Sequence, residues 1–98
     1  MFLGKVIGTV WATRKDENLV GAKFLIVRHL DLELNEKDNF VVAVDSVGAG
    51  EGEVVLVATG SSSRQTHFTQ NKPVDAVIMA IVDKLDVPLK ELLEQQES

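Results

Sequence analysis

The sequence predicts an all-β domain, a small closed or partly open β-barrel of five strands followed by a short C-terminal helix. Most apolar residues are Val, Ile, Leu and Ala, and apolar runs of strand length alternate with short polar or glycine-containing segments. A chain of 98 residues has room for one domain. A barrel fits best, because closure removes the exposed edges that so many aliphatic strands would otherwise present.

The first two predicted strands form a hairpin. Met1–Thr13 is rich in β-branched residues, and Gly4 and Gly8 allow this strand to bend or to be approached closely. Arg14–Asn18 is a polar turn, and a second strand follows over Leu19–Leu32. Two long strands across a short polar loop predict antiparallel pairing.

The middle of the chain predicts a second hairpin. Glu33–Asn39 is predicted to be an acidic loop, and Phe40–Val47 is a continuous apolar run, consistent with a strand buried on both faces. Glu53–Gly60 is the fourth predicted strand. The glycines between these two strands predict a tight, bulged hairpin, because glycine reaches positive φ and lets backbones approach.

The last part of the chain predicts a strand and a helix. Ser61–Lys72 is a polar loop, and Pro73–Val87 favours a fifth strand by its β-branched content and the proline at its entry. After Pro88, the side chains of Leu89, Leu92 and Leu93 share one face of a short helix. We therefore assign residues 1–87 to the barrel domain and residues 88–98 to a helical tail.

Composition argues against several classes of partner. The chain has no cysteine, which excludes disulfides and thiolate metal sites and favours an intracellular protein. The net charge of −5 and the shortage of aromatic residues argue against nucleic acid. No signal peptide is expected, and no apolar run approaches the ~20 residues of a membrane span. We expect neither nucleic acid nor membrane as a partner.

Charge is unevenly distributed along the chain. Residues 1–30 carry five basic and two acidic side chains, whereas residues 31–57 carry one basic and seven acidic side chains. This asymmetry would let a basic patch on one subunit meet an acidic patch on the next. Solvated surface loops would produce the same pattern.

The stretch Asp45–Arg64, with four glycines and four serines, is the most distinctive segment. A phosphate-binding loop would need a Lys and a Ser/Thr on a following helix. The residues here offer the carboxylates of Glu51 and Glu53 instead, and a strand follows. The pattern therefore argues against a nucleotide site, and no cofactor is predicted.

The sequence gives only weak indications of catalysis or of metal binding. The serines Ser61–Ser63 lie near His67 and Asp75, but none sits in a nucleophile elbow, so a hydrolase is a remote alternative. His29 and Asp31 share one strand face and are only the beginning of a metal site, which needs three or four converging ligands. We predict no catalytic residue and no metal site.

Several short motifs follow one another in a fixed order along almost the whole chain. The opening has Gly4, Gly8 and their alternating valines, followed by Leu19–Lys23. The most specific motif is Val42–Leu56, with the sequence VAVDSVGAGEGEVVL. Gly60–Arg64, Pro73–Ala76 and Ile81–Asp83 complete the pattern, which extends from Met1 to about Val87. Together these motifs resemble the EutN/CcmL family of bacterial microcompartment vertex proteins.

The resemblance implies an OB-like barrel that assembles as a ring of five. Such homopentamers cap the vertices of the polyhedral shell, in the bacterial cytoplasm, beside hexameric shell proteins, and have no catalysis of their own. It also implies that the glycine loops form the subunit interface or surround the five-fold axis. The candidate residues are Asp45, Gly48, Ala49, Gly50, Gly52, Glu53, Gly60, Ser61, Ser62, Arg64 and Asp75.

Two of these candidates carry expectations of their own. Arg64 could bridge to a carbonyl or carboxylate of the adjacent subunit in a bidentate way, although a solvated loop arginine is the alternative. Gly50 is expected to need positive φ, so that Gly50→Val would disrupt the ring or the fold.

The alternative function from another class is an OB-fold module that binds an oligonucleotide or a small ligand. The acidic charge and the single Trp11 disfavour it.

Overall fold

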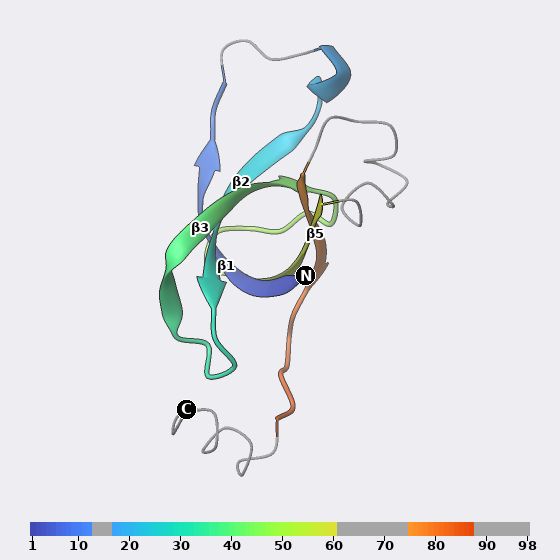
Figure 1. Cartoon of the computed structure of the whole chain (residues 1–98). Coiled ribbons are helices and arrows are strands. Elements are labelled where there is room, and N and C mark those ends of the chain that lie inside the picture. Colours follow the sequence, from blue (N-terminus) through green and yellow to red (C-terminus); the bar gives the residue numbers. More distant parts are fainter. Residues whose placement is uncertain (13–16, 61–74, 88–98) are drawn as a thin grey trace.

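The computed structural model describes residues 1–12, 17–60 and 75–87. Within these ranges five strands close into one barrel (Figure 1), which confirms the all-β, five-stranded prediction. Around the barrel the strands follow the order β1-β2-β3-β5-β4. The predicted C-terminal helix lies outside the described residues. The elements are β1 (Phe2–Val10), the 3₁₀ helix η1 (Glu17–Leu19), β2 (Lys23–Leu30), β3 (Glu36–Asp45), β4 (Val54–Thr59) and β5 (Ala76–Ile81).

The predicted hairpin of β1 and β2 is present and antiparallel. Gly4 permits the close approach: a Cβ there would collide with the side chain of Val27 and lie 3.0 Å from the carbonyl oxygen of Arg28. β2 begins at Lys23 and not at Leu19 as predicted. The intervening residues turn, with the Ala22 amide donating to the Leu19 carbonyl at 2.9 Å and Gly21 at a φ of 86°.

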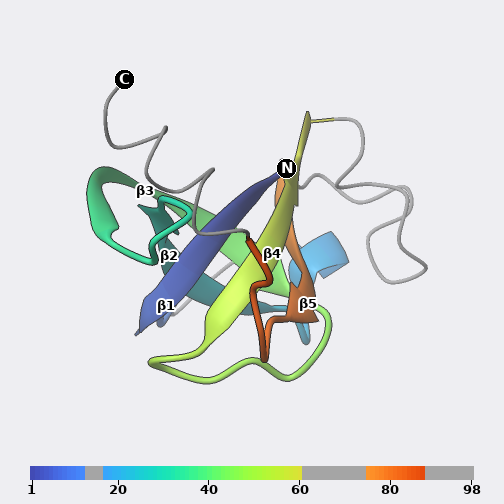
Figure 2. The same ribbon diagram turned by 90° about the horizontal axis from the view of Figure 1, so that it is seen from below.

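The predicted hairpin of β3 and β4 is wrong, because β5 lies between these two strands. β5 pairs in parallel with the end of β3, at Val44↔Val77 and Asp45↔Ile78, and antiparallel with β4. β4 pairs on its other side with β1. The loop of residues 46–53 therefore crosses one end of the barrel and does not make a tight turn (Figure 2).

The main core fills the barrel with side chains from all five strands. Val27, Val55, Val57 and Ile78 have no exposed surface, and Ala49 joins them from the loop. A second buried cluster lies around Val44, Ala58 and Val77. None of the helical segments in the described ranges is long and apolar enough to cross a membrane.

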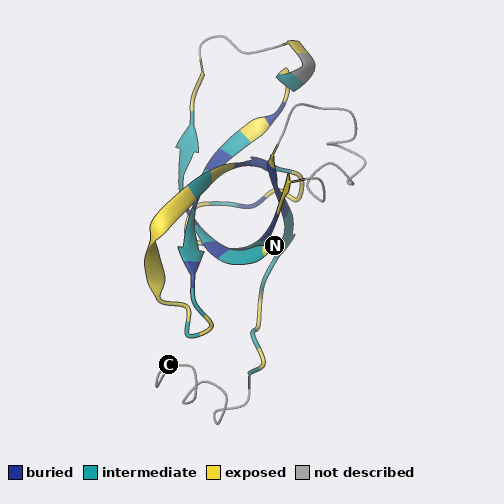
Figure 3. Ribbon diagram, in the orientation of Figure 1, coloured by how far each residue is buried: buried dark blue, intermediate teal, exposed yellow. Residues whose placement is uncertain are grey.

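β3 departs from its prediction in length and in burial. It begins at Glu36, within the predicted acidic loop, because Glu36 and the residues after it pair with β2. Only the residues near its C-terminal end are buried: Phe40 and Val42 are exposed, whereas Ala43 and Val44 are covered (Figure 3). An apolar run was not sufficient to predict burial, because the N-terminal half of β3 extends beyond the part of the barrel that β5 covers.

Candidate functional site

Asp45, the last residue of β3, organises the first half of the glycine loop. Its Oδ1 accepts hydrogen bonds from the backbone amides of Val47 at 3.1 Å and Ala49 at 3.2 Å. Such local bonds are the usual reason for aspartate at a turn. The Ala49 carbonyl in turn accepts a hydrogen bond from Lys23 Nζ at 3.3 Å. These contacts direct the Ala49 side chain into the barrel, where it is 1% exposed.

The second half of the loop is attached to β1. The amide of Gly52 donates to the carbonyl of Val6 at 2.8 Å, and the amide of Val6 donates to the carbonyl of Glu53 at 3.0 Å. Glu53 also folds back, because its Oε1 accepts a hydrogen bond from the Gly50 amide at 2.6 Å. The loop thus continues the β1–β4 pairing and closes this end of the barrel.

Two of the three loop glycines require positive φ, and Gly50 is not one of them. Gly48 has a φ of 76° and Gly52 a φ of 90°. The expectation that Gly50 needs positive φ is therefore wrong. A Cβ at Gly50 would meet only the flexible end of the Glu53 side chain, at 3.4 Å. The alternation of Gly with other residues did not reveal which glycines carry the strained backbone.

Most backbone amides named in the loop already donate hydrogen bonds within the chain, so few donors are left to bind a phosphate. Its amides at Val47, Ala49, Gly50 and Gly52 each donate to an acceptor of the same chain. A phosphate site would need such amides to converge on the ligand. β4 follows the loop where a nucleotide site would have a helix. The geometry suits a structural role for the loop.

The second predicted loop is described only at its two ends. The Gly60 amide donates to the Asp75 carbonyl at 2.9 Å, which ties the end of β4 to the start of β5, and Gly60 has a φ of 62°. Ser61, Ser62 and Arg64 lie outside the described residues, as do Ser63 and His67. Of the predicted site residues, the structure therefore brings together two separate groups, Asp45 to Glu53 at one loop and Gly60 with Asp75 at another.

His29 and Asp31 make separate local contacts. The imidazole of His29 stacks on the ring of Phe2, with centroids 3.7 Å apart and planes 5° apart. Partial burial, and then the charge of Lys37, lower the pKa of His29. Asp31 accepts hydrogen bonds from the amides of Glu33 and Asn35, and the bond from Asn35 is the main cause of its lowered pKa. No three potential ligands come together within residues 1–12, 17–60 and 75–87.

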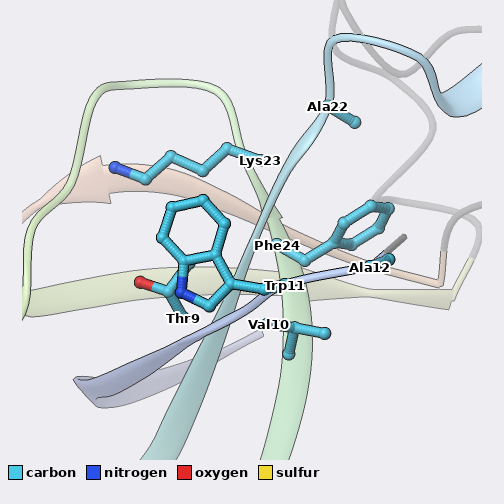
Figure 4. A pocket seen from close by; sticks show the side chains of 7 residues that line it. All are labelled: Thr9, Val10, Trp11, Ala12, Ala22, Lys23 and Phe24. Atoms are coloured by element: carbon cyan, nitrogen blue, oxygen red, sulfur yellow. The ribbon is translucent and has the colours of Figure 1, made fainter. Parts of the chain in front are cut away.

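The structure has a surface cavity of about 460 Å³ that the sequence did not predict. It lies between the end of β1 and the beginning of β2, with the side chains of Trp11 and Phe24 beside it (Figure 4). Trp11 is 90% exposed. Lys23 supplies the only charged side chain of the lining, and its ammonium bonds to the Ala49 carbonyl. Its described lining is therefore mostly apolar, with Lys23 as the charged member.

Known proteins match the chain over nearly its whole length. The family model "Ethanolamine utilisation protein EutN/carboxysome" matches residues 1–83. Bacterial microcompartment shell vertex protein GrpN of Rhodospirillum rubrum is 46% identical over 86 residues, which are 88% of this chain and 97% of GrpN. Carboxysome shell vertex protein CcmL of Synechococcus elongatus is 40% identical over 97 residues, which are 99% of this chain and 98% of CcmL.

A solved structure extends the likeness to three dimensions. The "GrpN pentameric microcompartment shell protein from Rhodospirillum rubrum" superimposes with a TM-score of 0.82 at 46% identity, covering 90% of this chain and all of that one (100%). This chain belongs to the EutN/CcmL family.

Proposed function

We propose that this chain forms a homopentamer that caps the vertices of a bacterial microcompartment shell, within the bacterial cytoplasm. One observation supports this above the others: the chain is 46% identical to a shell vertex protein of known structure, and that protein is a pentamer. A closed barrel with internally bonded loops suits a building block. The flat faces of the shell would be formed by hexameric proteins, which are the partners we propose for the rim of the ring.

Native mass spectrometry over a range of protein concentrations tests the ring. We expect a dominant species of five times the chain mass of 10.7 kDa, without bound nucleotide or metal. Dissociation on dilution should release monomers that keep the barrel. A monomer or dimer at every concentration would contradict the proposal. A pull-down from cells that produce a hexameric shell protein, with this chain as bait, tests the second partner.

We also propose that the protein has no catalytic activity. The carboxylate of Glu53 in the glycine loop accepts a hydrogen bond from the Gly50 amide of the same loop, which suits a structural role for this carboxylate. The relatives are likewise named for a place in a shell. Hydrolase assays with generic ester and phosphoester substrates should give rates equal to a buffer blank. A rate that follows protein concentration and disappears in Ser62→Ala would contradict this.

The alternative function, an OB-fold module that binds an oligonucleotide or a small ligand, has one observation in its favour. Exposed Trp11 with Phe24 and Lys23 offers an aromatic surface and a cation, which are the groups that bind single strands. Because Trp11 is the only tryptophan, its fluorescence reports on this surface alone. We expect no change on titration with oligonucleotides. A saturable change that is lost in Lys23→Gln would favour the alternative.

Arg64 remains our proposed contact across the ring. The family resemblance of Gly60–Arg64 supports it, together with the ability of a guanidinium to form two hydrogen bonds with a carboxylate. Arg64→Ala should lower the stability of the ring more than that of the monomer, and Arg64→Lys should restore only part of it. Thermal melts at several protein concentrations distinguish a loss of ring stability from a loss of monomer stability. A loss that does not depend on protein concentration would contradict an interface role.

A further inference from the structure

The N-terminal half of β3 is a strand with one unpaired side. β2 pairs with β3 from Glu36 to Asp45, but β5 reaches only Val44 and Asp45. In the part of the chain that the structure describes, no strand pairs with the other side of residues 36–43. Figure 1 shows this half of β3 standing away from the barrel together with β2. Closure of the barrel therefore protects only part of β3, and an open strand edge invites a partner.

This half of β3 also carries exposed apolar side chains. Phe40 is 61% exposed and Val42 is 45% exposed. Val42 lies opposite Ile26 of β2, and Ile26 is only partly buried. We call these three residues the β3 strip. Large apolar groups that gather on one surface, rather than being scattered singly, commonly mark an interaction site.

A hollow of about 450 Å³ lies on the same chain. Its lining includes Leu3 of β1 and Leu56 of β4, which are paired residues, and it extends to Leu30 of β2 and Lys37 of β3. Figure 2 shows β1 and β4 side by side. Asp31 and Lys37 are its charged lining residues. We call it the β1–β4 hollow, and its apolar lining consists of Met1, Phe2, Leu3, Leu30, Leu32 and Leu56.

We infer that in the ring the β3 strip of each copy packs into the β1–β4 hollow of the next copy. The inference rests on the proposed pentamer. A cyclic ring needs two different, complementary patches on every subunit. This chain carries an exposed apolar strip and an apolar recess that share no residue, although the recess borders the β2–β3 hairpin at Leu30 and Lys37. A second copy therefore supplies both matching surfaces, which explains why a chain that otherwise buries its apolar strands leaves Phe40 in solvent.

Phe40→Ser tests the projection. Burying a phenyl ring contributes enough that its loss should weaken each joint about ten-fold or more, so the five-fold species should disappear at concentrations where the wild type is assembled. Val20→Ser is the matched control, because Val20 is 70% exposed and belongs to neither patch. The Phe40→Ser monomer should keep the barrel, and its circular dichroism spectrum should show the same β-structure as the wild type. Val42→Ser is a milder variant of the same strip, should Phe40→Ser fail to fold.

Leu32→Lys tests the recess, since Leu32 lines the hollow and is 39% exposed. It should also yield monomers. The decisive sample is an equal mixture of Phe40→Ser and Leu32→Lys. The intact strip of one variant can enter the intact hollow of the other, but the two remaining patches are both defective. The mixture should therefore form a one-to-one dimer and no larger species.

The outcomes separate this inference from the proposed function. If wild type is pentameric and both strip variants remain pentameric, the inference is overturned and the proposed function stands. Pentamers of the strip variants that no longer bind hexameric shell proteins would overturn it too, because the strip would then face another protein. Absence of a heterodimer in the mixture would contradict the pairing of these two patches. A wild-type monomer would overturn the proposed function and this inference together.

Discussion

The carboxylate of Asp45 accepts a hydrogen bond from the backbone amide of Ala49 at 3.2 Å, at the point where β3 ends and the chain turns across the barrel. The same oxygen bonds the Val47 amide. Ala49 is thereby placed in the core, where it is 1% exposed, and the chain continues toward β1 instead of returning beside β3. The strand order of the barrel depends on this turn.

Asp45→Ala should destabilise the folded chain. Two amides lose their acceptor, at a cost of about 1–3 kcal/mol in the free energy of unfolding. Asp45→Asn retains a side-chain oxygen and should lose less than half as much. Urea unfolding at fixed protein concentration measures both values. Equal losses in the two variants would indicate that the charge of Asp45, and not its hydrogen bonds, stabilises the loop.

Gly52→Ala should cost about 1–2 kcal/mol, because an L-residue in the left-handed region is strained. Gly52 has a φ of 90°, and a Cβ there would meet nothing within 4 Å, so the loss would come from the backbone alone. Gly50→Ala is the matched control two residues earlier, without positive φ. Its unfolding midpoint in urea should remain close to that of the wild type. A larger loss at Gly50 than at Gly52 would contradict the loop geometry.

Gly4→Ala should destabilise the barrel by about 1–3 kcal/mol through overpacking. The added methyl would collide with the side chain of Val27, which has no exposed surface. In a Val27→Ala background the same change should cost less, because the colliding atoms are gone. A double-mutant cycle by chemical denaturation measures this coupling. Additive losses would show that the strain arises elsewhere, for instance at the Arg28 carbonyl.

Stability should fall as the pH decreases below the ordinary His29 pKa of 6.5. The pKa of folded His29 is lowered, so the unfolded chain takes up its proton first as the pH falls. The contribution of His29 to the free energy of unfolding is complete above pH 6.5. It is lost progressively as the pH falls from 6.5 to the lowered pKa of the folded state. It is small, because the imidazole remains partly exposed. Urea midpoints between about pH 7.5 and pH 5.5 follow this loss.

His29→Phe is the control for the pH effect. It removes the titrating group while keeping a ring that can stack on Phe2, so its stability should depend less on pH in this window. Asp31 does not confuse the result, since its pKa is lowered from 3.8 and its contribution is lost only in more acidic solution. A wild-type midpoint that rises on acidification would contradict the assigned direction.

Sequence patterns predicted much of this fold because they report local preferences. Aliphatic runs bounded by glycine and polar residues predicted all five strands, although β2 starts later and β3 starts earlier than expected. The lack of a Lys and of a following helix argued against a phosphate site in the glycine loop, and strand β4 does follow it. The detailed geometry of the loop was not predicted, because Gly48, Gly50 and Gly52 look alike in sequence and differ only in backbone angle.

The sequence by itself determined that the chain is all-β, roughly where the five strands lie, and, through motifs from Met1 to about Val87, the family. Only the tertiary structure decided that β5 lies between β3 and β4, because β5 pairs with β3 across the whole of β4, as at Val44↔Val77, and no local preference encodes such a pairing. Only the tertiary structure showed that Phe40 is left in solvent while Ala49 is buried. Hydrophobicity demands that an apolar side chain be covered, but it does not specify whether the cover comes from the same chain or from another copy.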